Sequence, residues 1–376
     1  MKNKKKYILF GAVDIGYRIE HYTKFIDNHF SDKLKAESFS KYVLPESHYK
    51  TKYTYTCRID KTLPLFLYFY SFFFFIYSLF RFDIFHFISG ETILTRKLRR
   101  IELRIYKLLG KCVIMHFVGS DIRSEEYLDW KSKNIIRFLN GEDSNIKSMK
   151  WQRKLIKEAE KYADHILVST PDLKKIIPSS IYYPVVLDYQ KFLDEVSAFS
   201  FKPKSNNEVV ILHSPSSVKK SNLKGTNHIM SVLNKIVASN KYNIRLILPA
   251  ENDVERRTNY SASRYELFSH YNEADIVIDQ MIIGWYGLLS VEVLVAGKYV
   301  VSYVEESLKE ELFPECPIKM ADVNTLEKVL IEIIEEILKG KNPFMFDIQR
   351  NWVKKYHTIE NMNEMLLTAW HLKKNI

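Results

Sequence analysis

Side chains that could carry out acid–base chemistry or bind an anion follow one apolar run in the first half of the chain. The sequence there reads HFVGSDIR and contains His116, Gly119, Ser120, Asp121 and Arg123. A histidine and two charged groups at the end of a predicted strand could form part of an active site or an acceptor-binding cleft. Two alternatives stay open, because the histidine could be a hydrogen-bonded core residue and the aspartate could cap the helix that follows.

A polar loop in the second half combines hydroxyl groups with lysines. It reads HSPSSVKKSNLKGT and includes Ser217, Lys219, Lys220 and Lys224, the last of which precedes Gly225 and a predicted helix. Backbone amides, hydroxyls and lysine side chains at the start of a helix suit a diphosphate. This loop is therefore a candidate phosphate-binding site.

A third region joins a glycine turn to a helix that carries a carboxylate. In DQMIIGWYGLLSVEVLVAGKYVV, Gly284 and Gly287 flank the turn, and Glu292 lies one turn into the helix. That carboxylate suits hydrogen bonds to the vicinal hydroxyls of a ribose, and a salt bridge to a lysine is the structural alternative. Near the N-terminus, Gly11 and Gly16 favour either a plain tight turn or a loop that faces a phosphate.

Short apolar runs alternate with longer amphipathic segments along the whole chain, as in strand–helix units around parallel sheets. Strands are predicted at 7–10, 84–88, 112–117, 165–168, 209–213, 244–248, 276–279 and 299–303. Helices are predicted at 18–29, 93–109, 147–162, 226–238, 263–271, 288–296 and 323–338. The alternation predicts an α/β protein.

The length of 376 residues favours two domains. We expect two Rossmann-like, doubly wound domains facing a cleft, with the chemistry at the carboxyl ends of the strands. The expected parts are an N-terminal domain over 1–190, a linker over 191–207, a C-terminal domain over 208–345, and helices over 346–376 that pack back toward the N-terminal domain.

The positive charge is confined to the first half. Residues 1–200 contain 34 basic and 23 acidic residues, whereas the remainder contains 22 of each. This asymmetry predicts a polyanionic partner for the first domain, with an ordinary basic surface as the alternative. Nucleic acid is discounted because no nucleic-acid-binding motif accompanies the charge. The three cysteines are widely spaced, which excludes a disulfide framework and predicts a cytoplasmic protein.

One uncharged aromatic run could contact a membrane. Residues 62–80 read TLPLFLYFYSFFFFIYSLF, and Arg58, Lys61 and Arg81 flank them. Polar residues at helical spacing favour a helix with one face in the core and an aromatic face at a membrane interface. A plain buried helix and a true membrane span are the alternatives. We expect peripheral association with the anionic inner face of the membrane.

In order and spacing, these motifs resemble those of the GT-B glycosyltransferases, in particular the retaining family-4-like group. The resemblance is strongest in ADIVIDQ followed by GWYGLLSVEVLVAGKYVV, and HSPSSVKKSNLKGT supports it. The first half adds FDIFHF, HFVGSDIR and ADHILVSTPDL, so that nearly the whole chain is covered.

The resemblance implies roles for individual residues. Lys224 would hold the donor diphosphate, with Ser217, Lys219 and Lys220 beside it, and Glu292 would bind the nucleotide ribose. Gly16, Gly287 and Leu288 would contribute loop positions or amides near the donor, and His116 would lie near the transferring sugar. Two positions depart from the pattern: Gly284 replaces the first glutamate of the EX7E motif, and Tyr299 replaces a proline.

The implied activity is transfer of a hexose from a nucleotide-sugar donor, with retention and without a metal or other cofactor. A lipid-linked or polysaccharide acceptor in cell-surface glycan synthesis would suit the basic, aromatic first half. A GT-B protein that has lost activity and serves as a membrane-associated binding or scaffold subunit is the alternative, because the first motif glutamate is missing.

Overall fold

The structure, a computed structural model, describes most of the chain. The described residues are 5–14, 18–41, 53–56, 64–123, 150–199, 207–215, 224–248, 264–340 and 346–372. They form two compact units. The first holds the described residues up to 123, from 150 to 187 and from 359 onward, and the second holds those from 188 to 358.

The first unit is built on a parallel sheet of seven described strands, in the order β3-β2-β1-β4-β5-β6-β7. The strands are β1 (Lys6–Ala12), β2 (Leu34–Ser40), β3 (Tyr55–Thr56), β4 (Ile84–Ile88), β5 (Cys112–Phe117), β6 (His165–Val168) and β7 (Ile181–Tyr182). The helices are α1 (Arg18–His29), α2 (Pro64–Arg81), α3 (Arg99–Leu108), α5 (Lys150–Tyr162), the short 3-10 helix η2 (Pro171–Lys175) and α13 (Ile359–Ala369).

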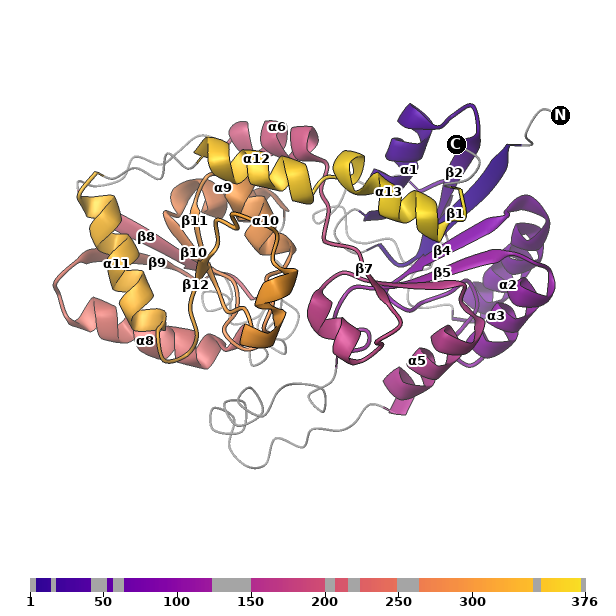
Figure 1. Cartoon of the computed structure of the whole chain (residues 1–376), viewed down its shortest axis with the longest axis horizontal. Helices are drawn as coiled ribbons and strands as arrows, with labels where there is room; N and C mark the ends of the chain where they lie inside the picture. The colour runs from indigo at the N-terminus through magenta and orange to yellow at the C-terminus, as the bar shows by residue number, and fades with distance from the viewer. Residues whose placement is uncertain are drawn as a thin grey trace. The chain divides into compact units, whose positions relative to one another are not determined.

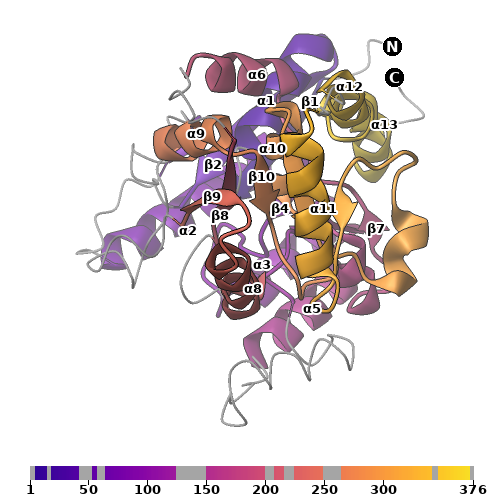
Figure 2. The ribbon, with the colours of Figure 1, turned by 90° about the vertical axis from the view of Figure 1, so that its left-hand side faces the viewer.

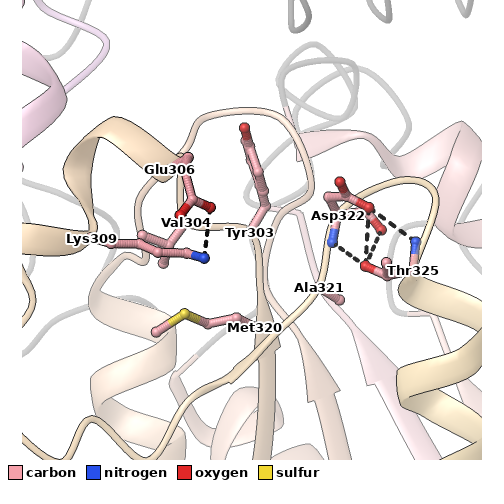
Figure 3. A pocket seen from close by; sticks show the side chains of 8 residues that line it. All are labelled: Tyr303, Val304, Glu306, Lys309, Met320, Ala321, Asp322 and Thr325. Atoms are coloured by element: carbon pink, nitrogen blue, oxygen red, sulfur yellow. Dashed lines mark hydrogen bonds and ion pairs between the residues drawn. The ribbon is translucent and has the colours of Figure 1, made fainter.

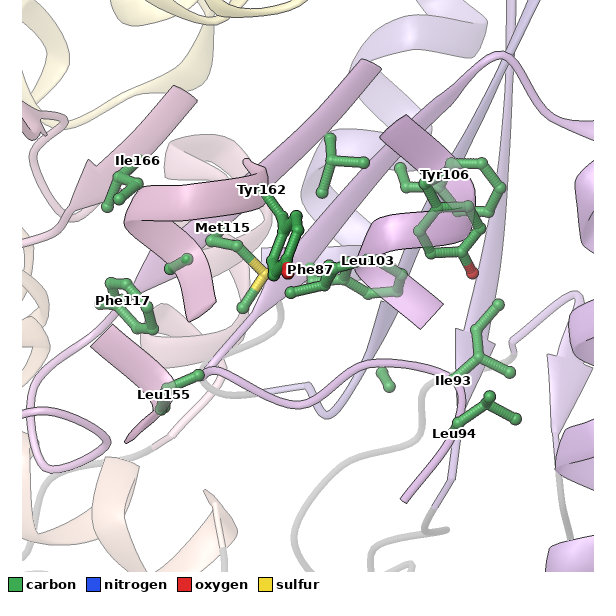
Figure 4. Close-up of a cluster of buried hydrophobic side chains, with 14 of the residues drawn as sticks. Phe87, Ile93, Leu94, Leu103, Tyr106, Met115, Phe117, Leu155, Tyr162 and Ile166 are labelled. Atoms are coloured by element: carbon green, nitrogen blue, oxygen red, sulfur yellow. The ribbon is translucent and has the colours of Figure 1, made fainter. Parts of the chain in front are cut away.

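Helices cover both faces of this sheet (Figure 1). On one face, α2, α3 and α5 pack on side chains such as Phe87, Met115 and Phe117, which form the cluster in Figure 4. On the other face, α1 and α13 pack against alternate residues of the same strands, among them Ile84 and Ile114. Burial of both faces explains why these strands read as continuous apolar runs.

The second unit repeats the architecture with a parallel sheet of five described strands, in the order β12-β11-β10-β8-β9. The strands are β8 (Glu208–His213), β9 (Asn243–Ile247), β10 (Ile276–Ile278), β11 (Tyr299–Ser302) and β12 (Lys319–Met320). The helices are α6 (Tyr189–Ser197), α8 (Thr226–Ala238), α9 (Arg264–Glu273), α10 (Leu288–Val295), the 3-10 helix η4 (Glu306–Glu311), α11 (Leu326–Leu338) and α12 (Phe346–Tyr356). Figure 2 shows α8 and α11 side by side, where they share one core with the sheet.

The predicted α/β class and the alternation of strands and helices are confirmed, but the expected linker is not a plain connection. Its first part belongs to α6, which packs against α9 and α10, so the second unit begins at Asp188. The Asp188 side chain caps α6 by accepting a hydrogen bond from the amide of Lys191. Of the two C-terminal helices, α13 packs against α1 in the first unit, whereas α12 packs against α10 in the second.

The predicted helix over 93–109 starts later than expected, at Arg99. The cause is Glu102, a fully buried carboxylate that accepts hydrogen bonds from the amides of Ile93 and Leu94 and from the hydroxyl of Thr92. Because those amides bond to a side chain, the segment before α3 is held in an irregular conformation.

Helix α2 exposes most of its aromatic side chains. Ser71, Phe74, Phe75 and Ser78 face the core at helical spacing, while the opposite face is exposed, with Phe80 87% accessible. The alternative prediction of a plain buried helix is therefore wrong. Within the described residues, no helix combines the length and hydropathy needed to cross a bilayer.

Candidate functional site

The predicted phosphate-binding lysine is held by a buried aspartate. Lys224 lies just before α8, and its Nζ donates to Asp279 Oδ1 over 2.7 Å. Asp279 follows β10, is only 2% exposed, and also accepts from the Gly287 amide at 3.0 Å and the Ser290 hydroxyl at 2.7 Å. Burial alone would raise the pKa of this carboxyl, but Lys224 and the other donors outweigh burial and hold its pKa below the ordinary value.

Asp279 thus joins the two motifs that the sequence presented separately. It connects the lysine after β8 to the glycine turn and the first turn of α10. Sequence reasoning assigned it no role, although a carboxylate at the end of a buried strand was a usable signal. The amide of Gly287, expected near a phosphate, donates to Asp279 in this structure, and Leu288 is the first residue of α10.

The turn at Gly284 is shaped for glycine. Its φ is +85°, and a Cβ there would lie 3.1 Å from the Cβ of Glu305. The Gly284 carbonyl accepts from the Glu305 amide at 3.0 Å. Gln280, 1% exposed, holds the turn by accepting from the Ile282 and Ile283 amides and donating to three oxygens. A glutamate at this position would therefore require another local backbone.

Glu292 lies inside α10 and is 4% exposed. Its Oε2 accepts a hydrogen bond from the Tyr271 hydroxyl at 2.9 Å. At the end of β8, close to Lys224 and Asp279, His213 Nδ1 donates to the Ile278 carbonyl, so its Nε2 accepts from the Thr226 hydroxyl. Burial lowers the pKa of His213 to about 4, which keeps this histidine neutral at the start of α8.

A small cavity of about 200 Å³ lies beside β11 and β12 in the same unit (Figure 3). It is lined by Tyr303, Val304, Glu306, Lys309, Met320, Ala321, Asp322 and Thr325. None of the predicted donor-binding residues that the structure describes lines it. Its volume is below the roughly 300–1,000 Å³ of ordinary ligand pockets.

In the first unit, His116 belongs to a directed chain of hydrogen bonds. Trp370, directly after α13, donates its Nε1–H to His86 Nδ1 at 3.1 Å. The indole is a donor only, so His86 Nε2 must donate to His116 Nδ1, at 3.2 Å. His116 Nε2 then donates to the hydroxyl of Ser169, at 2.9 Å.

Both histidines of this chain are fully buried and neutral. Burial, with Arg18 nearby, lowers the pKa of His86 to about 3, and burial, Arg18 and His86 lower the pKa of His116 well below its ordinary value. Both ring nitrogens of His116 already have partners. This geometry favours a positioning role over proton transfer, and the predicted catalytic role of His116 stays a prediction.

The polar residues after His116 build a loop. The Asp121 carboxylate accepts from the amides of Val118, Gly119 and Ile122, so it closes this turn. Arg123 forms a two-pronged ion pair with Asp172, at 2.7 and 3.1 Å, as well as a hydrogen bond to Thr170.

Ser120 and Gly119 belong to the same loop, whereas several predicted donor residues lie outside the described part of the chain. Ser120 is exposed, and its carbonyl accepts from Gln152. Gly119 has a φ of +143°, a conformation that residues with a side chain rarely adopt, and this explains the glycine. The predicted donor residues Gly16, Ser217, Lys219 and Lys220 lie outside the described residues.

No protein-family model matches the sequence, and no curated protein matches it significantly. Solved structures do match over the whole chain. Sucrose-phosphate synthase from Thermosynechococcus elongatus gives a TM-score of 0.60 at 11% identity, with 98% of each chain covered. HepE from Anabaena, solved with UDP-glucose, gives 0.57 at 12% identity and covers 98% of this chain and 100% of its own.

A third match shows how far this likeness reaches. UDP-GlcNAc 2-epimerase from Methanocaldococcus jannaschii gives a TM-score of 0.52 at 10% identity, covering 98% of this chain and 100% of its own. An epimerase and a synthase share the architecture, so the reaction has to be argued from the site. With its two parallel sheets flanked by helices, the protein has the GT-B fold of these glycosyltransferases.

Proposed function

We propose that this protein transfers a sugar from a nucleotide-sugar donor to a lipid-linked or polysaccharide acceptor, in the synthesis of cell-surface glycans. The observation that carries the proposal is the Lys224–Asp279 pair at the carboxyl ends of β8 and β10, tied to the glycine turn before α10. This edge of a parallel α/β sheet is where such folds bind nucleotides.

Lys224 is suited to stabilising a departing nucleoside diphosphate. Its ammonium group has three N–H donors, and one of them is used by Asp279. The side chain is 17% exposed, so the buried aspartate fixes the direction of the lysine while leaving donors for phosphate oxygens. A preorganised charge of this kind acts on the charge that develops in the transition state.

Glu292 would bind the nucleotide ribose, with the Tyr271 hydroxyl orienting its carboxylate. We further propose that the sugar is transferred with retention, without a protein nucleophile, and without a metal or other cofactor. The support is the resemblance of the motifs, together with the positive potential that Lys224 and the loop amides supply. His116 would help to position the acceptor side through Ser169.

The second candidate is an inactive binding or scaffold subunit with the same fold. Its specific support is Gly284, where the backbone has φ +85° and Glu305 packs against the site of the missing side chain. This candidate predicts nucleotide binding at Lys224 without turnover.

Release of the nucleotide from the donor tests the proposal directly. Purified protein is incubated with UDP-, GDP-, ADP- and CMP-sugars, and the product nucleotide is measured with and without membrane extract as acceptor source. The matched control is Lys235→Ala, because Lys235 forms an exposed ion pair with Glu327 in the same unit. Turnover that Lys224→Ala strongly reduces and Lys235→Ala keeps supports a transferase, whereas binding without turnover supports the scaffold.

The support for a membrane-bound acceptor is an exposed surface on the first unit, which we call the α2–α3 face. It combines the exposed aromatic residues of α2, such as Phe73 and Phe80, with Ile101 and Leu108 of α3. Exposed cations on and beside α3 are Arg96, Lys97, Arg100, Arg104 and Lys107. Apolar side chains beside cations match an anionic lipid surface, and we propose peripheral binding at the cytoplasmic face of the membrane.

Three cations near this run already have partners. Arg96 forms an ion pair with Glu91 and lies over the ring of Trp151. Arg99 is 2% exposed and forms an ion pair with Glu158 at 2.8 Å. Arg81 forms an ion pair with Glu37 and lies over the ring of Tyr7. The attraction is therefore assigned to the exposed cations of α3, while Arg58 and Lys61 lie outside the described residues.

Vesicle flotation tests the α2–α3 face. Replacing Lys97, Arg100 and Arg104 with Ser should weaken binding to phosphatidylglycerol vesicles by about 1 kcal/mol per residue at low salt, and less at high salt. Phe73→Ser with Phe80→Ser should weaken binding at both salt concentrations. The control is replacement of Lys235, Lys241 and Lys328 in the second unit. Equal binding of wild type to neutral and anionic vesicles would contradict the electrostatic part.

A further inference from the structure

Arg18, at the start of α1, is a buried cation with no ion pair among the described residues. It is 5% exposed, and its one hydrogen bond to a described residue goes from Nη1 to the hydroxyl of Ser169. A buried guanidinium without a counter-ion strongly opposes folding, so such groups are normally paired. Burial also lowers its pKa.

The acidic groups near Arg18 are committed to other partners. Asp14 accepts from the Ile19 amide at 3.2 Å and from the Tyr53 hydroxyl at 3.3 Å. Asp121 accepts from three loop amides. Both interact electrostatically with Arg18, but neither forms an ion pair with it. The positive charge is therefore only partly balanced within the described part of the chain.

The hydrogen-bond chain that ends at Ser169 leaves this hydroxyl ready to donate. Its oxygen accepts from His116 Nε2 and from Arg18. With two donors already directed at the oxygen, the hydroxyl proton must point to a further acceptor. The direction of the chain is set by the Trp370 indole, 284 residues away from His86 in sequence, which can only donate.

Two tyrosine hydroxyls complete the surroundings of Arg18. Tyr22 and Tyr183 are fully buried, and both interact electrostatically with Arg18 and with each other. Apart from their mutual contact, neither hydroxyl has a hydrogen-bond partner among the described residues. The cluster is thus rich in donors and poor in acceptors, which is the composition of an anion site.

We propose that Arg18 and Ser169, with the hydroxyls of Tyr22 and Tyr183, bind a phosphoryl group of a substrate. A phosphoryl group offers several acceptor oxygens and the negative charge that this cluster lacks. Its source rests on the proposed function: either the diphosphate of the nucleotide-sugar donor or the phosphate of a lipid-linked acceptor.

Thermal unfolding with inorganic phosphate tests the site without requiring activity. Phosphate should raise the Tm of the wild type, because a ligand that binds the folded state stabilises it. Arg18→Met should keep or raise the Tm measured without phosphate, and it should weaken phosphate binding at least tenfold. The control is Arg99→Met, which removes a buried cation that has a carboxylate partner. That variant should lower the Tm by several degrees and keep the phosphate-dependent rise.

A structural role for Arg18 gives the opposite pattern. If Arg18→Met lowers the Tm as Arg99→Met does and keeps the phosphate-dependent rise, the inference is wrong. It is also wrong if Lys224→Ala alone abolishes that rise. Should Arg18→Met fail to fold, Arg18→Lys keeps the charge but loses the fork of N–H groups. It should weaken phosphate binding several-fold, and unchanged affinity would overturn the proposal.

Two further ligands identify the source of the phosphoryl group. If the donor supplies it, Arg18→Met weakens binding of UDP and leaves farnesyl phosphate unaffected. If the acceptor supplies it, the variant weakens binding of farnesyl phosphate and leaves UDP unaffected. Unchanged affinity for both ligands overturns the inference. The test with inorganic phosphate measures binding and not turnover. It therefore stays valid even if the transferase proposal fails.

Discussion

Each unit places a basic side chain at the carboxyl edge of its sheet, but the two units treat that charge differently. In the second unit, Lys224 has a buried carboxylate partner 2.7 Å away. In the first unit, Arg18 lies among neutral histidines, tyrosines and a serine, with Asp14 and Asp121 near it, but it forms no ion pair with a described residue. One charge has a carboxylate partner, and the other is only partly balanced by the described residues.

The difference shows how each charge affects the free energy of unfolding of its unit. A compensated lysine can be fixed in direction without destabilising the fold, and it still offers donors to a ligand. A buried arginine that is only partly balanced opposes folding until an anion arrives, so ligand binding and stability should be coupled in the first unit. The following substitutions break or sharpen this contrast.

The largest effect is expected from Asp279→Asn, which makes Lys224 resemble Arg18. The change removes the partner of Lys224 and weakens the bonds from Gly287 and Ser290. Loss of one partner of a buried ion pair should lower the free energy of unfolding by about 3–5 kcal/mol. Urea denaturation measures this. The control Ser290→Ala removes one hydrogen bond and should lower it by about 1 kcal/mol; equal effects would contradict the importance of the ion pair.

Lys224→Ala should reduce kcat/KM by about 2–4 kcal/mol in transition-state terms, because one preorganised charge is lost. The single change also leaves Asp279 buried without its cation. The double variant with Asp279→Asn should regain stability relative to Lys224→Ala but no activity. Steady-state kinetics and urea denaturation of the three variants separate the two roles. Wild-type kcat/KM in Lys224→Ala would refute the diphosphate assignment.

Acid should weaken both units through histidines that stay neutral in the fold. The pKa falls from an ordinary 6.5 to about 3 for His86 and to about 4 for His213. As pH drops below 6.5, these two histidines become protonated in the unfolded chain but stay neutral in the folded chain. Each histidine therefore removes up to about 1.4 kcal/mol of stability per pH unit until its folded pKa is reached. NMR of the ring nitrogens should find both rings neutral at pH 5; a protonated His86 at that pH would break the directed chain.

The smallest effect is expected from Glu292→Gln, which keeps the shape but removes the charge. Charge-assisted hydrogen bonds to ribose hydroxyls should weaken by about 1 kcal/mol. The KM for the donor should therefore rise, while the fold stays intact. Tyr271→Phe is the matched variant, because it removes the hydroxyl that orients the carboxylate. A marked loss of stability in Glu292→Gln with unchanged KM would favour a structural role instead.

Much of the architecture was predictable because burial on both faces of a parallel sheet leaves apolar runs in the sequence. The run 84–88 became β4 with the same bounds. Strand β2 was missed because its sequence, LKAESFS, carries charges that only tertiary contacts neutralise. Its Glu37 is 4% exposed and pairs with Arg81 of α2 and with the Tyr55 hydroxyl of β3.

By itself, the sequence determined the class of the fold, the Lys224 and Glu292 motifs and the aromatic run that became α2, because these depend on local composition and spacing. Tertiary structure alone decided which charges have partners. Asp279 meets Lys224 from 55 residues away, and Trp370 orients His86 across 284 residues. Such pairings follow from which strand ends become neighbours in a sheet, and no local pattern of residues records that order.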